Sequence, residues 1–338
     1  MKNLSVLKEE EMPYLVHDTT HPSYPVSRHP CLPVFLTLTG VCPQVRLQWY
    51  NSLIGKFPNL HALDTGFTGS GRTITCPPYL GFLEKFLSGQ PHASPLQTYR
   101  GVLTPNDPSF VHAQRHLRGL HELSIDIVTR GHNAPRAAVA VIRLPVLELL
   151  TVAGYYPASP LAWASHWDLP RLRYLAVYSN EGDEYYLENA LVNFGSKLTH
   201  LYLRGAFTPN SLVGLESLCP NLVCLEMDWT DVFLSFSCPK TLRTVIFHNT
   251  AWLFHYLQPS FERQLRKIHE NPKEWQGLRM IKDMTVTSTG EGGRLIRWWT
   301  KEDFQAMQRR GISVVDREGK PLRVGDIKGD SGADYPVT

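Results

Sequence analysis

One leucine-centred pattern returns along most of the chain and constrains its fold more than any other feature. It reads as an apolar residue, often Pro, any residue, Leu, two variable residues, Leu, one variable residue and an aliphatic residue. A unit of about 25 residues cannot bury its apolar side alone, so neighbouring repeats must stack and share a leucine core. We call the first Leu position of the pattern its anchor. From Leu120 on, successive anchors are 27, 25, 26, 24 and 20 residues apart. The anchors are Phe35, Leu60, Leu120, Leu147, Leu172, Leu198, Leu222 and Leu242.

Prolines mark a second landmark in phase with the leucines. Pro108, Pro135 and Pro160 each lie 12 residues before an anchor, and Pro209 lies 13 before one. Three of the four follow a helix-capping residue, and a cap followed by Pro at the first helical position is a start signal for a helix. Each repeat is therefore predicted to be a helix, a turn and a short strand. Residues 211–218 have the apolar spacing of such a helix.

Residues 31–250 thus resemble a leucine-rich-repeat solenoid, similar to the irregular repeats of fungal F-box-type proteins. The resemblance implies an α/β fold with a curved parallel sheet on the concave face and helices on the convex face. It implies a non-enzymatic scaffold that holds a protein partner on the concave face, as in the substrate-recognition part of an F-box-type ubiquitin-ligase receptor. Residues 1–30 contain no recognisable F-box, so a ligase adaptor is an expected partner only if an F-box lies upstream.

The remaining segments are assigned from weaker patterns. Thr300 with Asp303 predicts a capped helix over 301–310, followed by Gly311 and a hairpin. The long interval between the anchors Leu60 and Leu120 leaves two alternatives, a degenerate repeat near residues 97–102 or an inserted loop. We expect four parts, which are an irregular N-terminal arm over 1–30, the solenoid over 31–250, an α+β capping region over 251–324 and a flexible tail over 325–338.

Composition narrows the class of protein. Residues 1–250 carry 19 basic and 19 acidic side chains, so the expected solenoid lacks the basic surplus of a nucleic-acid-binding surface. The charged run at residues 8–11 interrupts any apolar signal segment, and no apolar stretch approaches the roughly 20 residues that cross a bilayer. With six cysteines and no secretory start, we expect a reducing compartment, the cytoplasm or the nucleus, and no membrane association.

Two motifs offer functions of other classes. The segment Gly66–Thr73 has the spacing of a phosphate-binding loop, which would make the chain a nucleotide-binding enzyme, but Arg72 stands where that loop needs Lys. Arg294–Trp299 interleaves basic and aromatic residues, as single-stranded nucleic-acid sites do. The favoured interpretations are a solenoid turn for Gly66–Thr73 and a cap segment for Arg294–Trp299. His112 and His116 lack the Glu of a metalloprotease motif, and no cofactor or metal site is expected.

Strand alternation identifies the candidate binding residues. If Leu123 and Ile125 turn inward, their neighbours along the strand face the concave side, and the same register applies to every later strand. On this register Cys224, Ile246 and His248 also face the concave side. Tyr and Arg are enriched at binding hot spots, and the candidate partner-binding residues are Tyr174, Tyr178, His200, Tyr202, Arg204, Glu226 and Asp228.

Overall fold

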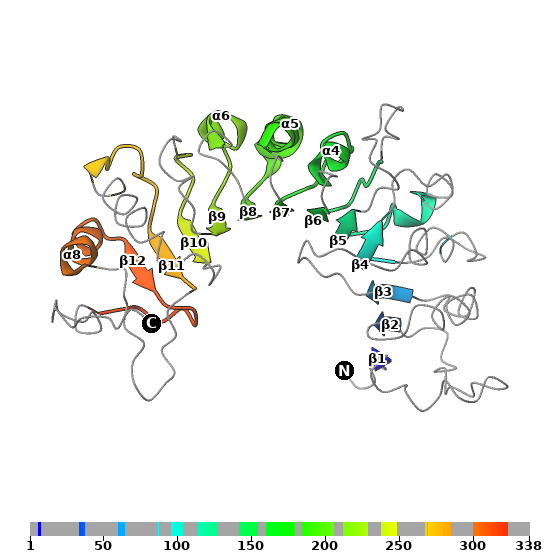
Figure 1. The fold of residues 1–338 in the computed structure, drawn as a ribbon, viewed down its shortest axis with the longest axis horizontal. Coiled ribbons are helices and arrows are strands. Elements are labelled where there is room, and N and C mark those ends of the chain that lie inside the picture. Colours follow the sequence, from blue (N-terminus) through cyan, green and yellow to red (C-terminus); the bar gives the residue numbers. More distant parts are fainter. Residues whose placement is uncertain are drawn as a thin grey trace, which may run out of the picture. The chain divides into compact units, whose positions relative to one another are not determined.

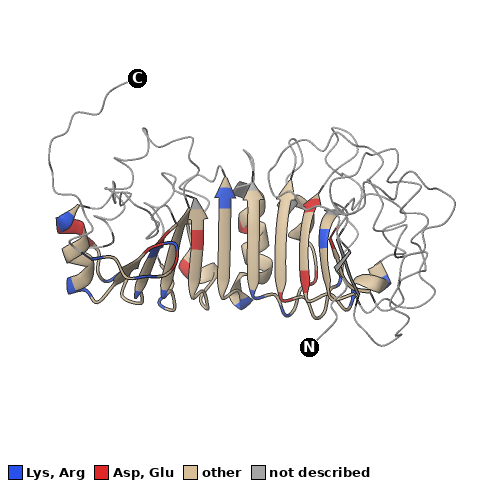
Figure 2. Cartoon of the chain, turned by 90° about the horizontal axis from the view of Figure 1, so that it is seen from below, with Lys and Arg blue, Asp and Glu red and all other residues tan. Residues whose placement is uncertain are grey.

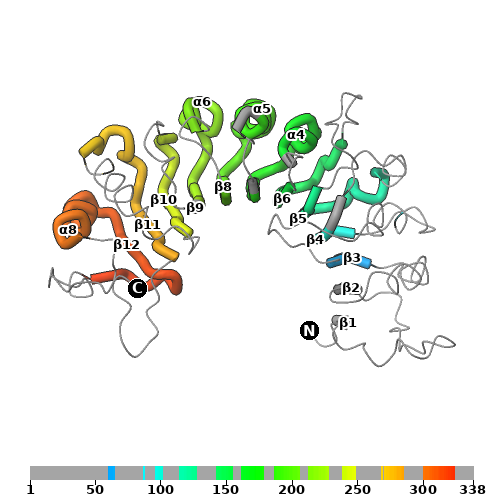
Figure 3. The backbone as a smooth tube through the Cα atoms, in the orientation of Figure 1, coloured from blue at the N-terminus to red at the C-terminus, as the bar shows by residue number. Residues whose placement is uncertain are grey.

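The computed structural model divides into two compact units, Met1–Lys197 and Leu198–Thr338. We call them the N-terminal unit and the C-terminal unit. In each, consecutive described strands lie side by side in chain order, as the backbone trace shows (Figure 3). The structure describes residues 6–7, 34–37, 60–64, 87, 96–103, 114–127, 142–154, 160–179, 184–205, 212–228, 238–248, 268, 270–284 and 300–323.

The described strands of the N-terminal unit form a parallel sheet in chain order. Parallel pairing of consecutive strands requires a crossover between them, which the repeat supplies. The first strand lies within the expected N-terminal arm and pairs with the second. The strands are β1 (Val6–Leu7), β2 (Val34–Thr37), β3 (Leu60–Asp64), β4 (Thr98–Leu103), β5 (Glu122–Ile127), β6 (Leu149–Gly154) and β7 (Tyr174–Ser179).

Strand β4 decides between the two alternatives for the long interval in the repeat. It pairs in parallel with β3 on one side and with β5 on the other. Tyr99 lies beside Leu123 in this register, and its side chain is buried. The interval therefore contains a degenerate repeat, in which an aromatic residue takes the place of a leucine.

Two described helices cover one side of strands β6 and β7 (Figure 1). Helix α4 (Pro160–Ala164) begins at the proline that the sequence predicts as a start. Helix α5 (Glu184–Phe194) continues into the 3-10 turn η3 (Gly195–Lys197). The side-chain amide of Asn193 on α5 donates hydrogen bonds to the carbonyl oxygens of Ser165 and Trp167, at 2.9 and 3.0 Å. These bonds tie α5 to the turn that follows α4.

The core of the N-terminal unit is a stack of aliphatic rows. Leu123, Leu150 and Leu175 occupy one row across β5, β6 and β7, and all three are buried. Two residues further along the same strands, a second inward-facing row holds Ile125, Val152 and Val177. Each repeat thus supplies one layer, and burial of these layers removes apolar area that a single repeat would leave in water.

The C-terminal unit continues the same construction. Its strands pair in parallel in chain order, and the row Leu201, Leu225, Val245, Ile281 and Val314 is buried. The leucine pattern predicts that the repeats end at residue 250, but two further parallel strands follow that position. The strands are β8 (His200–Gly205), β9 (Cys224–Asp228), β10 (Thr244–His248), β11 (Met280–Asp283) and β12 (Ser313–Val315).

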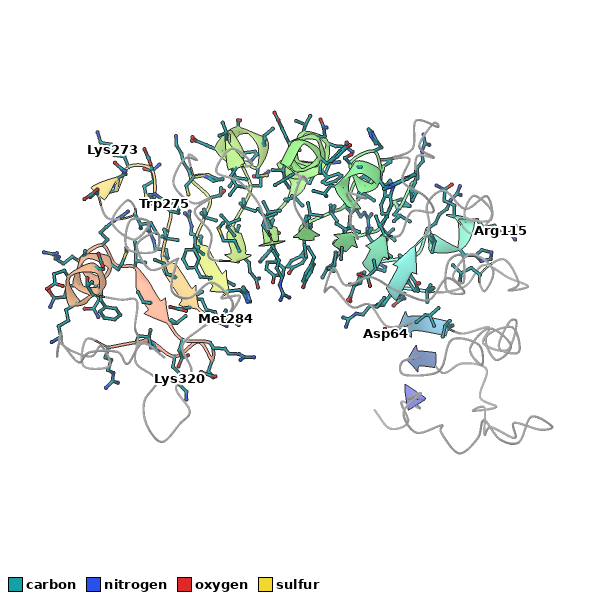
Figure 4. The ribbon with its side chains drawn as sticks, in the orientation of Figure 1. Asp64, Arg115, Lys273, Trp275, Met284 and Lys320 are labelled. Carbon is teal, nitrogen blue, oxygen red and sulfur yellow. The ribbon has the colours of Figure 1, made fainter. Side chains whose placement is uncertain are left out.

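The leucine pattern does not predict strand β11, because Asp283 stands where other repeats carry an apolar residue. Asp283 lies in register beside Phe247 of β10, and both side chains are buried. Two residues that Figure 4 labels bracket this repeat, since Trp275 precedes β11 and Met284 follows it. Trp275 is buried and supplies apolar area to this repeat.

The helices of the C-terminal unit correct one expectation and confirm another. Helix α6 (Leu215–Leu218) is shorter than the predicted helix over 211–218, because Gly214 adopts a left-handed φ of 80° that a helix cannot contain. Helix α8 (Lys301–Arg309) follows the prediction, since the Thr300 hydroxyl accepts a hydrogen bond from the Asp303 backbone N–H at 3.1 Å.

The last strand is closed by the predicted hairpin. Val315 forms an antiparallel bridge to Pro321, and the Asp316 carboxylate accepts the Lys320 backbone N–H at 2.7 Å. Gly319 adopts a positive φ of 82° within this turn. Both units therefore have an α/β leucine-rich-repeat fold, with a parallel sheet on one side and helices or connecting turns on the other.

Candidate interaction face

The open face is our name for the side of each sheet that lies opposite the helices. It corresponds to the concave face expected from the sequence. Figure 2 shows the strands from this side, and charged residues are sparse along them. Because strand side chains alternate, residues on either side of a buried leucine project onto the open face.

In the N-terminal unit, Tyr174 and Tyr178 project from β7 onto the open face and are half-buried. Tyr174 lies in register beside Leu149, and Tyr178 beside Ala153. The floor beside them is made of small or short side chains that are already buried. These residues are Ser124, Asp126, Thr151, Ala153 and Ala176.

An exposed ion pair lies on the open face of β4 and β5. The Arg100 guanidinium donates to the Glu122 carboxylate from Nε at 3.1 Å and from Nη2 at 2.6 Å. Asp64 of β3 lies in register beside Arg100. Exposed pairs of this kind contribute about 1 kcal/mol or less to stability, so the pair adds little to holding the fold.

In the C-terminal unit, β8 carries three of the predicted residues. His200 and Arg204 are exposed at the two ends of the strand, while Tyr202 between them is only 8% exposed. The His200 Nδ1 lies 2.9 Å from the hydroxyl of Thr199. Tyr202 therefore combines a position on the open face with the burial of a core residue.

Tyr202 belongs to a cluster that joins three strands. The His248 Nε2 on β10 donates a hydrogen bond to Oε1 of Glu226 on β9. The ring centroids of Tyr202 and His248 lie 5.3 Å apart, with the ring planes tilted by 43°. The side chains of His248 and Glu226 are 26% and 23% exposed. We call Tyr202, Glu226 and His248 the Tyr–His–Glu cluster.

Cys224 adjoins this cluster but is unsuited to nucleophilic chemistry. It lies in register between His200 and Thr244 and is 8% exposed. Burial, and secondarily the Glu226 charge, raises the pKa of the Cys224 thiol to about 11. The reactive thiolate is therefore scarce at neutral pH.

The structure unites only part of the predicted set. Tyr202 and Glu226 are neighbours in register, and Asp228 is on β9 beside His248, with its side chain outside the described residues. Strand alternation also places His248 on this face, although it is not one of the candidate partner-binding residues. The sequence feature that indicates its place on the open face is its position two residues after Ile246. Ile246 is the in-register neighbour of Glu226.

Several other predictions fall outside the described residues. They include the loop Gly66–Thr73, the segment Arg294–Trp299, His112 and the tail over 325–338. Within the part of the chain that the structure describes, no three His, Cys, Asp or Glu side chains gather in a way that could hold a metal ion. No helix among the described residues is long and apolar enough to cross a membrane.

Comparisons with known proteins find similar solved structures but no similar sequences. No protein-family model matches the chain, and no curated protein sequence matches it. The structure is similar to the leucine-rich repeat-containing protein LegL7 of Legionella pneumophila, with 13% identity and a TM-score of 0.43, over 91% of this chain and 100% of that one. It is also similar to a protein of Bacteroides fragilis, with 12% identity and a TM-score of 0.41, over 85% of this chain and 75% of that one.

Proposed function

We propose that the protein is a non-enzymatic scaffold that binds a protein partner on the open face of its sheets. The Tyr–His–Glu cluster is the observation that carries this proposal. It places an aromatic ring, an imidazole and a carboxylate side by side on three adjacent strands, partly withdrawn from water. Aromatic residues in well-packed, partly desolvated positions dominate protein-binding energies.

The geometry of the face supports a protein partner over a small ligand. Side chains of the cluster and of the neighbouring positions spread across β8, β9 and β10, and Arg204 and His200 add polar groups at the strand ends. A mixed polar and aromatic surface with an exposed rim is typical of protein interfaces.

A finer role, the substrate-recognition part of an F-box-type ubiquitin-ligase receptor, is also proposed, with residence in the cytoplasm or the nucleus. Its support is the resemblance of residues 31–250 to the repeats of fungal F-box-type proteins. The test is a binding titration between the full-length protein and the ligase adaptor that F-box helices bind. Binding supports this role, and its absence leaves the scaffold without the ligase connection.

The scaffold itself is tested by alanine variants of the open face. Partners are first identified by crosslinking in cells, and each is then purified for a binding titration. We expect Tyr202→Ala together with Arg204→Ala to weaken binding by about 2 kcal/mol. Because Tyr202 is largely buried, its removal also lowers stability, so Arg204→Ala alone provides the variant that tests binding without a loss of core area.

A matched control lies on the helix side of the same unit. Val213 and Glu216 are exposed there, so Val213→Ala with Glu216→Ala truncates two side chains away from the open face. Binding should survive the control pair and fall with the open-face variants, when melting curves confirm folded protein. Equal affinity for all variants per folded molecule would refute the open face as the binding site.

A further inference from the structure

We infer that the Tyr–His–Glu cluster receives a basic side chain, lysine or arginine, of the protein partner. This inference rests on the proposed function, since it names the chemical group that the open face of the C-terminal unit recognises. It follows from three properties of the cluster, which are the hydrogen bonding of Glu226, the orientation of its carboxylate and the aromatic and apolar side chains beside it.

Among the described residues, one acceptor oxygen of Glu226 is left unused. Its Oε1 accepts the hydrogen bond from His248, whereas Oε2 has no hydrogen-bond or ion-pair partner among the described residues. The side chain is only 23% exposed. A partly desolvated carboxylate with a vacant acceptor gains most from a charged donor, because such hydrogen bonds are about twice as strong as neutral ones.

His248 orients this carboxylate. A carboxylate only accepts hydrogen bonds, so the imidazole Nε2 is the donor. This bond occupies one of the two carboxylate oxygens of Glu226. The bond also restricts the rotamers of Glu226, which reduces the entropy lost when a partner binds.

The walls of the cluster suit a cation with an apolar stem. Tyr202 lies in register beside Glu226 on one side, and Ile246 lies in register on the other. A cation near the face of a tyrosine ring is attracted by its π electrons. Lysine and arginine carry their charge at the end of an apolar stem, which can pack on Ile246 while the charged group reaches Glu226.

Two described cations share the open face with the cluster. Arg204 is exposed on β8, and Lys282 of β11 lies in register beside Ile246. Among the ion pairs of the described residues, however, Glu226 pairs with His248 and with neither cation. Their presence means that an acidic partner is the competing outcome, so the experiment includes an acidic probe.

The test uses small probes and the full chain. N-acetylated amides of arginine, lysine, citrulline and glutamate are titrated while the methyl resonance of Ile246 is followed by NMR. Citrulline matches arginine in shape but carries no charge. We expect saturable shifts with arginine and lysine, and affinity lower by about tenfold or more for citrulline, because the charged contact is lost. Equal shifts with citrulline, or shifts with glutamate alone, overturn the inference.

Two pairs of variants separate recognition from structure. Glu226→Gln keeps an acceptor for His248 but removes the charge, and Tyr202→Leu keeps apolar area but removes the ring. Both should abolish or weaken arginine binding by about tenfold, while Glu216→Gln and Tyr202→Phe should retain it. Unchanged binding in Glu226→Gln would overturn the inference.

The two proposals fail in different ways. If a purified partner binds wild type, loses affinity with Arg204→Ala and keeps it with Glu226→Gln, the basic-side-chain inference is wrong and the scaffold proposal stands. If no open-face variant changes the affinity of any partner, both are wrong.

Discussion

The guanidinium of Arg243 donates a hydrogen bond from Nη1 to the carbonyl oxygen of Gly277, 3.0 Å away in the next repeat. The same Nη1 donates to the Lys240 carbonyl oxygen at 2.9 Å. Arg243 thus joins the turn before β10 to the turn before β11. This bond is one of the contacts that hold consecutive repeats together outside the leucine core.

The first prediction concerns the close approach of these turns. An added methyl group at Gly277 would press on the Lys240 carbonyl and lie 2.7 Å from the Leu242 carbonyl oxygen. Gly277→Ala should therefore destabilise the C-terminal unit by about 1–3 kcal/mol through overpacking. Urea denaturation measures the change in the free energy of unfolding. Gly119→Ala is the control, because the nearest atom to its new methyl group is 3.5 Å away. Equal stability of the two variants would contradict the close packing.

The second prediction tests the leucine rows. Leu175 and Leu201 are 0% and 1% exposed, which confirms the burial expected from the repeat. Replacing either with Asp places an unpaired charge in an apolar layer and should cost about 4 kcal/mol or more. Circular-dichroism melting measures the loss. Val192→Asp is the control for Leu175, because Val192 is 67% exposed on α5, and a stable Leu175→Asp protein would show that the register is wrong.

The third prediction concerns pH and His116. Burial, and secondarily the Arg115 charge, holds the pKa of His116 below its ordinary value. Its Nε2 also accepts a hydrogen bond from Arg115 at 3.1 Å, which protonation would abolish. The unfolded chain therefore binds the proton more readily. The stability from neutral His116 is complete above about pH 6.5 and is lost as the pH falls toward the lowered pKa.

Melting curves at about pH 7.5 and about pH 5 check the direction of this pH dependence. The wild-type protein should lose more stability between the two conditions than His116→Gln, which cannot titrate but can still accept from Arg115. An identical pH dependence of the two proteins would mean that His116 does not contribute.

The fourth prediction concerns thiol reactivity. Burial raises the pKa of Cys219 to about 12, and burial with the Glu226 charge raises that of Cys224 to about 11. Iodoacetamide should label both slowly in the folded protein near pH 8. Glu226→Gln removes a like charge and should speed labelling of Cys224 alone, as mapped by mass spectrometry. Faster labelling of Cys219 as well would indicate general loosening instead.

Much of the fold could be predicted from the sequence because its causes are local or periodic. Leucines that recur about every 25 residues require stacked repeats, and alternation within each strand then assigns Leu175 and Leu201 to the core. The cap at Thr300 and Asp303 depends on residues three apart, so it too is visible in the sequence. Strand β11 is less visible because Asp283 interrupts the apolar pattern.

The contacts of the candidate site were decided by the tertiary structure. Alternation places Glu226 and His248 on one face, but their hydrogen bond also depends on the register between β9 and β10 and on the rotamers of both side chains. The anchors from Leu120 to Leu242 are 20 to 27 residues apart, so the diagonal neighbour of a given side chain cannot be counted from the sequence alone. Burial of Tyr202, and of Ser124 and Asp126 on the open face of the N-terminal unit, depends likewise on what surrounds each strand in space. The sequence by itself determined which residues form the layers, because periodicity dictates them, and packing between strands determined which surface residues meet.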